Sequence, residues 1–368
     1  MDASLRMSLG RIIAQGLVPA TAALSPLDAV NNLAALQGQQ ASAIPWAIGV
    51  RCTGVSRARV EESFARGELV RSWPMRGTVH VTSARDHHWL RRLLRHRRAS
   101  WERQALSLGL TDALVERAAQ VACELLETSP LGVSRVALVE AWGRNGIDTV
   151  TASSAQDGLR RRHLIMRLHL DGVLTAGPVR AGEHLIVDAR SLPAAPGVAK
   201  GEPGHEEALA VLAARYAWGH GPIDAADLAR WTGLTLTEAR RALAGARVAG
   251  ESVGLPLAEC GGGLARADLA DLVEDFRAEA EAMHALPSFD ELHVGYKDRS
   301  CLTDEAGEAL ICPAKNGMFR PIVVEGGRVV AVRAPGREIV MVKGYESRRR
   351  PAARSFDDWE KWLSETQQ

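Results

Sequence analysis

The chain has 368 residues, of which 46% are hydrophobic and 24% charged, as in a globular protein. A chain of this length is too long to fold around one typical hydrophobic core, so about two to four domains are expected. No apolar run reaches the roughly 20 residues of a membrane-spanning helix, which predicts a cytoplasmic location. The five cysteines are odd in number and contain no Cys-x-x-Cys pair, so neither a disulfide framework nor a zinc site is expected.

Charge is distributed unevenly although the formal net charge is only +1. Residues 1–103 hold 15 arginines and 7 acidic residues, so this segment carries +8 and the remainder −7. The densest run is RRLLRHRR, from Arg91 to Arg98. This asymmetry predicts an N-terminal half that faces DNA, and the alternative for the run itself is a solvated, charged helix face.

The first predicted helix covers residues 5–16, and a second begins at Ser25. Ser25 is the expected N-cap, Pro26 occupies the first helical position, and Gly38 is the expected stop. The apolar face of this second helix consists of Leu27, Val30, Leu33, Ala34 and Leu36. Gln37 would then close the helix while Gln39 begins the exit loop. Spacing alone favours a capping role for these amides, because glutamines near a helix end often hydrogen-bond free carbonyls.

Three segments in succession have the order of a winged helix, in which helices precede a strand pair. In the first, a helix at 57–65 precedes strands at 69–73 and 78–81, and residues 86–127 are helical. In the second, helices at 136–142 and 159–170 precede strands at 173–175 and 184–187. In the third, helices at 225–231 and 237–243 surround a turn at Thr232 and Gly233, with Thr235 or Thr237 as the second N-cap.

Residues from Pro287 onward have the character of short strands. Strands are predicted at 309–312, 319–324 and 329–333, with one turn at 325–327 and another at 314–317 that carries Lys315 at its tip. A closing helix at 356–363 is expected to pack Trp359 and Trp362 onto this sheet.

These patterns predict an α+β fold, mainly α, of three tandem winged-helix units followed by a β-rich region, closed as a C around DNA. The expected domains are residues 1–128, 129–198, 205–285 and 286–368, with a Pro/Gly/Ala-rich linker at 192–204. Charge and position predict DNA contacts from Arg71, Arg76, Arg91, Arg95, Arg161, Arg167 and Lys315.

Several motifs resemble one known family. The stretch from Leu33 to Gln39, LAALQGQ, and RSWPMRGTVHVTSARDHHWL from Arg71 are similar to the winged-helix DNA glycosylases of the HTH_42 (AlkX/YcaQ/AlkZ) family. YKDRS from Tyr296 and FRP at residues 319–321 extend the resemblance over most of the chain. The closest match is to the branch of the family that unhooks azinomycin-type interstrand crosslinks. The resemblance implies that Gln37 and Gln39 are the catalytic pair, with Gly38 where the family usually has an aliphatic residue.

The chemistry of two amides restricts the substrate. Gln37 and Gln39 cannot titrate; an amide carbonyl can hold a water molecule, but it is a poor base. The leaving base must therefore already be activated, as a purine alkylated at N7 or N3 is by its positive charge. No catalytic lysine is evident, so we expect a monofunctional enzyme without cofactor or metal, acting as a monomer on alkylated or crosslinked duplex DNA at the nucleoid.

A second interpretation fits every helix-turn-helix signal equally well. The chain would then be a tandem winged-helix transcription regulator without catalysis. The W-x-M-R-G-T turn and the Q-x-Q pair favour the enzyme, and no separate effector domain is apparent in the sequence.

Overall fold

The computed structural model describes residues 1–75, 77–95, 99–147, 149, 154–193 and 198–365. It contains both helix and sheet, with helix the larger part. The chain divides into two compact units, which are described separately below. The first unit joins residues 1–60 to residues 206–368, and the second comprises residues 61–205. The finer division into four domains, the winged-helix assignment and the C shape stay predictions. No helix among these residues is long and apolar enough to cross a membrane.

The first unit is assembled from both ends of the sequence. Its N-terminal elements are α1 (Ala3–Ala14), α2 (Pro26–Asn32), β1 (Leu36–Gln37), the short helix η1 (Ala41–Ala43), α3 (Ile44–Gly49) and the start of α4 (Arg57–Ala65). Its C-terminal elements are α10 (His205–His220), α11 (Ala225–Thr232), α12 (Leu236–Ser252), β6 (Leu257–Cys260), β7 (Gly263–Arg266), α13 (Leu269–Asp275), α14 (Arg277–Glu281), β8 (His284–Leu286), α15 (Glu291–Val294), α16 (Glu305–Ile311), β9 (Ile322–Glu325), β10 (Arg328–Arg333), η4 (Pro335–Arg337), β11 (Ile339–Met341), η5 (Glu346–Arg348) and α17 (Arg349–Ser364).

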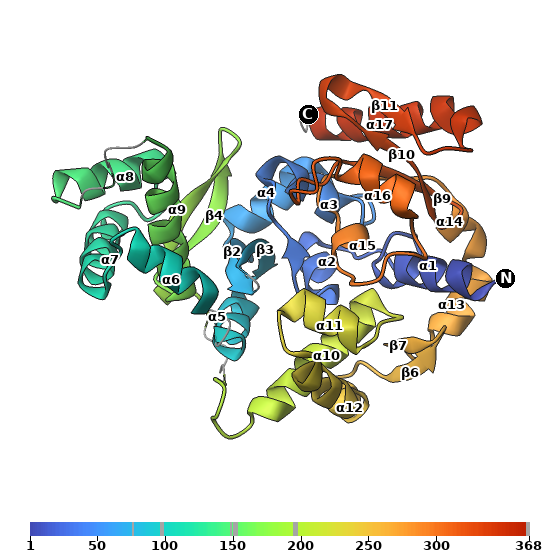
Figure 1. Cartoon of the computed structure of the whole chain (residues 1–368), viewed down its shortest axis with the longest axis horizontal. Helices are drawn as coiled ribbons and strands as arrows, with labels where there is room; N and C mark the ends of the chain where they lie inside the picture. The colour runs from blue at the N-terminus through green and yellow to red at the C-terminus, as the bar shows by residue number, and fades with distance from the viewer. Residues whose placement is uncertain (76, 96–98, 148, 150–153, 194–197, 366–368) are drawn as a thin grey trace. The chain divides into compact units, whose positions relative to one another are not determined.

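A four-stranded antiparallel sheet forms the centre of this unit, in the order β11-β10-β9-β8. Its residues alternate between two cores, as the period of a strand requires. Ile322 and Val324 face a core that contains Leu9 and Ile12 of α1. Val323 faces the other core, which is covered by α17 (Figure 1). The sheet is therefore buried on both faces.

The closing helix is longer than predicted and packs on more than the sheet. Trp359 joins the sheet core, as expected. Trp362 instead packs edge-on against Trp46 of α3, with 5.1 Å between the ring centroids, and its indole N–H donates to the Val55 carbonyl at 3.0 Å. Gly49 permits this approach, because a β-carbon there would lie 2.5 Å from the Trp362 ring.

The predicted helix-turn-helix at residues 225–243 is confirmed as α11 and α12. Gly233 makes the turn with a φ of 80°, a conformation that glycine adopts without strain. Thr235 is the second N-cap, and its side chain and that of Glu238 form a reciprocal capping box. The antiparallel pair β6 and β7 follows.

The described residues of the second unit form the end of α4 and a series of helices and strands after it. These are β2 (Leu69–Met75), β3 (Thr78–Ser83), α5 (Ala84–Leu93), α6 (Ala99–Ser107), α7 (Asp112–Glu127), α8 (Arg135–Arg144), α9 (Ser154–Leu170), β4 (Leu174–Arg180) and β5 (Glu183–Asp188), with η3 (Ala189–Ser191). Both predicted hairpins are present. They join through the pair Arg71 and Ala176, which gives the strand order β3-β2-β4-β5 within this unit.

One predicted strand is wrong. Residues 309–311 belong to α16, and Cys312 follows its end, so no strand forms there. Asp304 caps this helix by accepting a hydrogen bond from the Gly307 N–H at 2.8 Å, and Glu305 and Glu308 lie in its first turn. Negative charge stabilises a helix N-terminus, so the cap outweighs the short apolar run at its end.

Candidate functional site

The Q-x-Q segment follows a helix that ends earlier than predicted. Ser25 and Pro26 begin α2 as expected, but the helix ends at Asn32 and Gln37 lies on β1. Ala34, not a glycine, takes the left-handed conformation between them, with a φ of 61°. Tertiary packing explains the early end. A β-carbon at Gly219 of α10 would collide with the Asn32 carbonyl oxygen, so α10 lies where another turn of α2 would continue.

One residue separates the two predicted catalytic amides, with Gln37 on β1 and Gln39 in the bend that follows it. Gln37 and Gln39 are both half-buried, and Gly38 between them is buried. Gln40 is exposed, and its amide donates to the Ser42 hydroxyl at 3.1 Å. The prediction that Gln37 closes the helix is therefore wrong, because α2 ends at Asn32.

A buried carboxylate lies directly against the backbone of Gln37. The Gln37 N–H donates to Oε2 of Glu291 at 2.9 Å, although 254 residues separate the two. The other oxygen, Oε1, accepts from the Trp231 indole at 2.7 Å and lies 3.3 Å from Nε2 of His220. Glu291 has no exposed surface. Both of its oxygens are thus directed at N–H donors of the protein.

Glu291 belongs to a larger buried polar network in the first unit. Its neighbour Asp290 forms a two-bond ion pair with Arg51, whose second nitrogen also donates to Gln15 at 2.7 Å. Gln15 in turn donates to the Tyr296 hydroxyl at 2.9 Å. Burial raises the pKa of Tyr296 well above its ordinary value, so its hydroxyl remains a proton donor.

A second ion pair extends the network to the YKDRS motif. Arg11 pairs with Asp227 at 3.0 Å and lies 3.8 Å from the centre of the Tyr296 ring. The backbone N–H of Lys297 also donates to Asp227 at 2.7 Å. These contacts give Tyr296 and Lys297 structural positions within the buried network.

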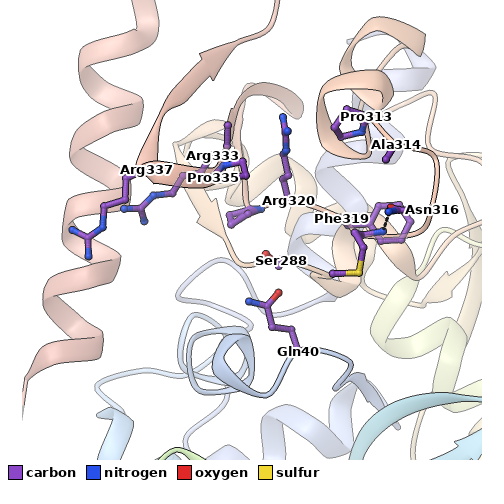
Figure 2. Close-up of a pocket in the computed structure, with 13 residues that line it drawn as sticks. Gln40, Ser288, Pro313, Ala314, Asn316, Phe319, Arg320, Arg333, Pro335 and Arg337 are labelled. Atoms are coloured by element: carbon purple, nitrogen blue, oxygen red, sulfur yellow. Dashed lines mark hydrogen bonds between the residues drawn. The ribbon is translucent and has the colours of Figure 1, made fainter. Parts of the chain in front are cut away.

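A pocket of about 490 Å³ opens beside Gln40 in the first unit (Figure 2). One side is formed by the loop after α16 and the other by the residues that follow β10. The lining is mainly apolar with arginines among it, and consists of Gln40, Ser288, Pro313, Ala314, Asn316, Met318, Phe319, Arg320, Pro321, Arg333, Ala334, Pro335 and Arg337. Gln37 and Gln39 are not among these thirteen described residues.

Three arginines give the pocket positive charge. Arg333 and Arg337 share Glu360, with 3.0 Å between the Arg337 guanidinium and that carboxylate. Arg320 donates to the Leu310 carbonyl at 3.3 Å. Among the described residues, Glu360 is the one acidic side chain that forms an ion pair with these cations, and the Arg337 side chain is 76% exposed. Such a surface suits the phosphate backbone of DNA.

The predicted DNA contacts occupy different environments. Lys315 is exposed in the loop after α16, between the pocket residues Ala314 and Asn316. Arg95 is exposed after α5, whereas Arg76 lies outside the described residues.

The other four predicted DNA contacts belong to the second unit and are partly buried: Arg71, Arg91, Arg161 and Arg167. Burial lowers the pKa of Arg71 to about 10. Arg91 donates to the Leu170 carbonyl at 3.0 Å, and Arg167 pairs with Asp171 at 2.6 Å. Arg161 is half-buried on α9.

Sequence reasoning missed Glu291 and the pocket arginines. The signal for Glu291 was an acidic pair inside the apolar run SFDELHVGY, because buried carboxylates require partners. Arg320 lies inside the FRP motif already noted. Arg333 and Arg337 carry no signal in sequence. Within the described residues, no group of three or more His, Cys, Asp or Glu side chains is arranged to hold a metal ion.

Comparison with known proteins identifies the family. A family model described as "DNA glycosylase AlkZ-like" matches residues 30–342. Among solved structures, Streptomyces sahachiroi DNA glycosylase AlkZ is similar, with a TM-score of 0.66 and 22% identity over 96% of this chain and 97% of that one. A search of the curated proteins found no match. The match spans most of the chain, including the Q-x-Q segment and the pocket, and the chain therefore belongs to the AlkZ-like family of DNA glycosylases, whose partner is DNA.

Proposed function

We propose that this glycosylase is monofunctional, that it hydrolyses the N-glycosidic bond of cationic N7-alkylpurines and unhooks azinomycin-type interstrand crosslinks, and that Gln37 and Gln39 are its catalytic residues. It would act as a monomer on duplex DNA. The family match supports the enzyme and gives no support to the regulator.

The observation that carries this proposal is the position of the two amides. Both are half-buried, Gln37 on β1 and Gln39 in the bend after it, and the next residue, Gln40, lines a pocket edged by arginines. Phosphate contacts at such a pocket would hold the duplex beside the Q-x-Q segment. The fold shared with the Streptomyces glycosylase supports the same assignment.

Two amides suffice because the substrate supplies the charge. Bond cleavage leaves an oxocarbenium-like sugar and, for a cationic purine, a neutral leaving base that needs no proton. The amide carbonyls accept hydrogen bonds from a water molecule and direct it at C1′. Such positioning contributes several kcal/mol to catalysis, on the order of 7 at best.

An abasic site is the expected product. A glycosylase that also cuts the strand uses an amine to form a Schiff base with the sugar. Lysine is absent from the thirteen described residues that line the pocket. Water therefore remains the nucleophile in the proposed reaction.

Crosslinked substrates restrict how the base is reached. A purine tethered to the opposite strand cannot rotate fully out of the duplex without its partner. We expect the enzyme to approach the nucleotide within the duplex through an open cleft. A structure with DNA that encloses the base in a tight pocket around Gln37 would contradict this.

The test is alkali-revealed cleavage of a duplex that carries one N7-methylguanine. Wild type should yield abasic product, and Gln37→Ala and Gln39→Ala should each lose at least about 100-fold in rate. Gln120→Ala is the matched control, since it removes an exposed amide on α7 that belongs neither to the motif nor to the pocket, and should stay within about threefold.

The crosslinked duplex is the second substrate. Wild type could bind the N7-methylguanine duplex without forming abasic product. Cleavage of an azinomycin-crosslinked duplex would then show that the enzyme acts on a narrower range of lesions, and no cleavage would show that it lacks glycosylase activity. Failure on both substrates would overturn the proposal.

A further inference from the structure

The Glu291 carboxylate contacts the backbone of the Q-x-Q segment. The water-positioning step proposed above does not use this carboxylate. It is the first residue of α15 and fully buried, and its carboxylate accepts the Gln37 N–H. Backbone and indole N–H groups can only donate, so the contacts from Gln37 and Trp231 require an acceptor on each oxygen of Glu291. The ionised carboxylate meets this requirement in full.

Two buried ion pairs lie in the same network as Glu291. Arg11 is paired with Asp227 and Arg51 with Asp290, and all four side chains are nearly fully buried. Glu291 accepts from the N–H groups of Gln37 and Trp231 and lies close to His220. The network thus connects to β1 through one hydrogen bond from the Gln37 backbone.

We propose that Glu291 is a positioning residue for catalysis, whose carboxylate fixes the backbone of Gln37 and so holds in place the segment that carries both amides. This inference rests on the function proposed above for Gln37 and Gln39. The hydrogen bond from the Gln37 N–H joins β1 to the buried network, so the backbone from which both side chains extend is fixed relative to α15.

Glu291→Gln tests this positioning role. Glutamine keeps the shape but has one acceptor oxygen, so either the Gln37 N–H or the Trp231 N–H must face an NH₂ group. We expect the single-turnover rate on N7-methylguanine DNA to fall about 100-fold, which is the scale of an error of about 1 Å in position. The Kd for the duplex should change by less than about threefold, since Glu291 contacts no DNA.

Tyr216→Phe is the matched control. The Tyr216 hydroxyl donates to the Gly295 carbonyl at 2.7 Å, so it joins α10 to the end of α15 without reaching Gln37. This variant loses a buried hydrogen bond of similar length and should keep its rate within about threefold. Thermal unfolding of Glu291→Gln and Tyr216→Phe measures separately how much each substitution lowers the stability of the protein.

A double-mutant comparison tests whether Glu291 acts through residue 37. In a Gln37→Ala background, Glu291→Gln should reduce the remaining rate by far less than it does alone. Equal losses in both backgrounds would overturn the proposal.

The remaining outcomes separate this inference from the proposed function. An active wild type, an inactive Gln37→Ala and an unimpaired Glu291→Gln would overturn the role of Glu291 and leave the function intact. Equal rate losses in Glu291→Gln and Tyr216→Phe would also overturn it, because the role would be structural. An inactive wild type overturns both.

If Glu291→Gln does not fold, Trp231→Phe replaces it. This change removes the 2.7 Å bond that orients the carboxylate while leaving Gln37 and Glu291 in place. A folded Trp231→Phe protein should lose about tenfold in rate, and a wild-type rate would overturn the proposal.

Discussion

Arg51 and Asp290 form a two-bond ion pair at the centre of the first unit, with N–O distances of 2.8 and 2.9 Å. Both side chains are almost completely buried. Asp290 also accepts the Leu292 N–H and so caps α15, which places Glu291 beneath Gln37.

Removing one partner of this pair should be costly. We expect Asp290→Asn to lower the free energy of unfolding by about 3 to 5 kcal/mol, because a buried Arg51 would lose its counter-charge. Urea denaturation measures this change. The control is Glu281→Gln, since its partner Arg277 is half-exposed and the pair contributes at most about 1 kcal/mol. Similar losses in both variants would contradict the prediction.

The close approach of α10 to the end of α2 depends on Gly219. A β-carbon there would overlap the Asn32 carbonyl oxygen, so Gly219→Ala should destabilise the protein by about 3 kcal/mol and displace the backbone before β1. Gly143→Ala is the control, because nothing lies within 4 Å of its β-carbon position in α8. That variant should gain about 0.5 to 1 kcal/mol from helix propensity. Thermal unfolding would measure the stability of the Gly219→Ala and Gly143→Ala variants, and a glycosylase assay would show whether displacement of the backbone before β1 reduces activity.

DNA affinity should depend on the arginines of the pocket. Arg337→Ala removes a largely exposed cation, and we expect weaker duplex binding together with a salt dependence whose log–log slope decreases by about 1. Fluorescence anisotropy over a range of salt concentrations measures both quantities. Arg277→Ala changes the net charge equally but lies outside the pocket, and should leave the slope unaltered. An equal effect of the two variants would indicate a general charge effect.

Acid should destabilise the second unit through two buried histidines. Burial lowers the pKa of His169 to about 3 and that of His184 to about 4, from an ordinary value of 6.5. Between pH 6.5 and about 4 the unfolded chain binds protons that the folded chain excludes, so stability falls as pH falls. At pH 5 the loss is about 2 kcal/mol for each histidine.

Urea denaturation of wild type and His184→Gln tests this pH dependence. Glutamine can still donate to the Gly177 carbonyl, which lies 2.9 Å from the His184 ring. Because glutamine does not titrate, the stability difference between the two proteins should shift by about 2 kcal/mol in favour of the variant between pH 7 and pH 5. Parallel pH dependences would contradict the prediction.

Features set by neighbouring residues could be predicted from the sequence. The caps at Ser25 and Thr235, the turn at Gly233 and both hairpins of the second unit depend on residues only a few positions apart. Because contacts between residues close in the sequence stabilise these features, the sequence pattern predicts them.

Features set by distant segments could not be predicted. The early end of α2 depends on Gly219 of a helix that begins far along the chain. The contact between Gln37 and Glu291 joins residues 254 positions apart, and nothing in either local sequence specifies the other. The family resemblance led to Gln37 and Gln39, whose catalytic role stays a prediction, but only the packed structure reveals the carboxylate that holds their strand.

The division of the first unit between both ends of the chain determines when it can be completed during synthesis. Asp290 leaves the ribosome 239 residues after Arg51, which is about 10 to 50 seconds later at typical rates of translation. Until then Arg51 lacks its ion-pair partner Asp290, and the Gln37 N–H of β1 lacks its acceptor Glu291. The nascent chain therefore carries its Q-x-Q segment without the buried support of the finished enzyme, and this support arrives only after the whole second unit has been translated.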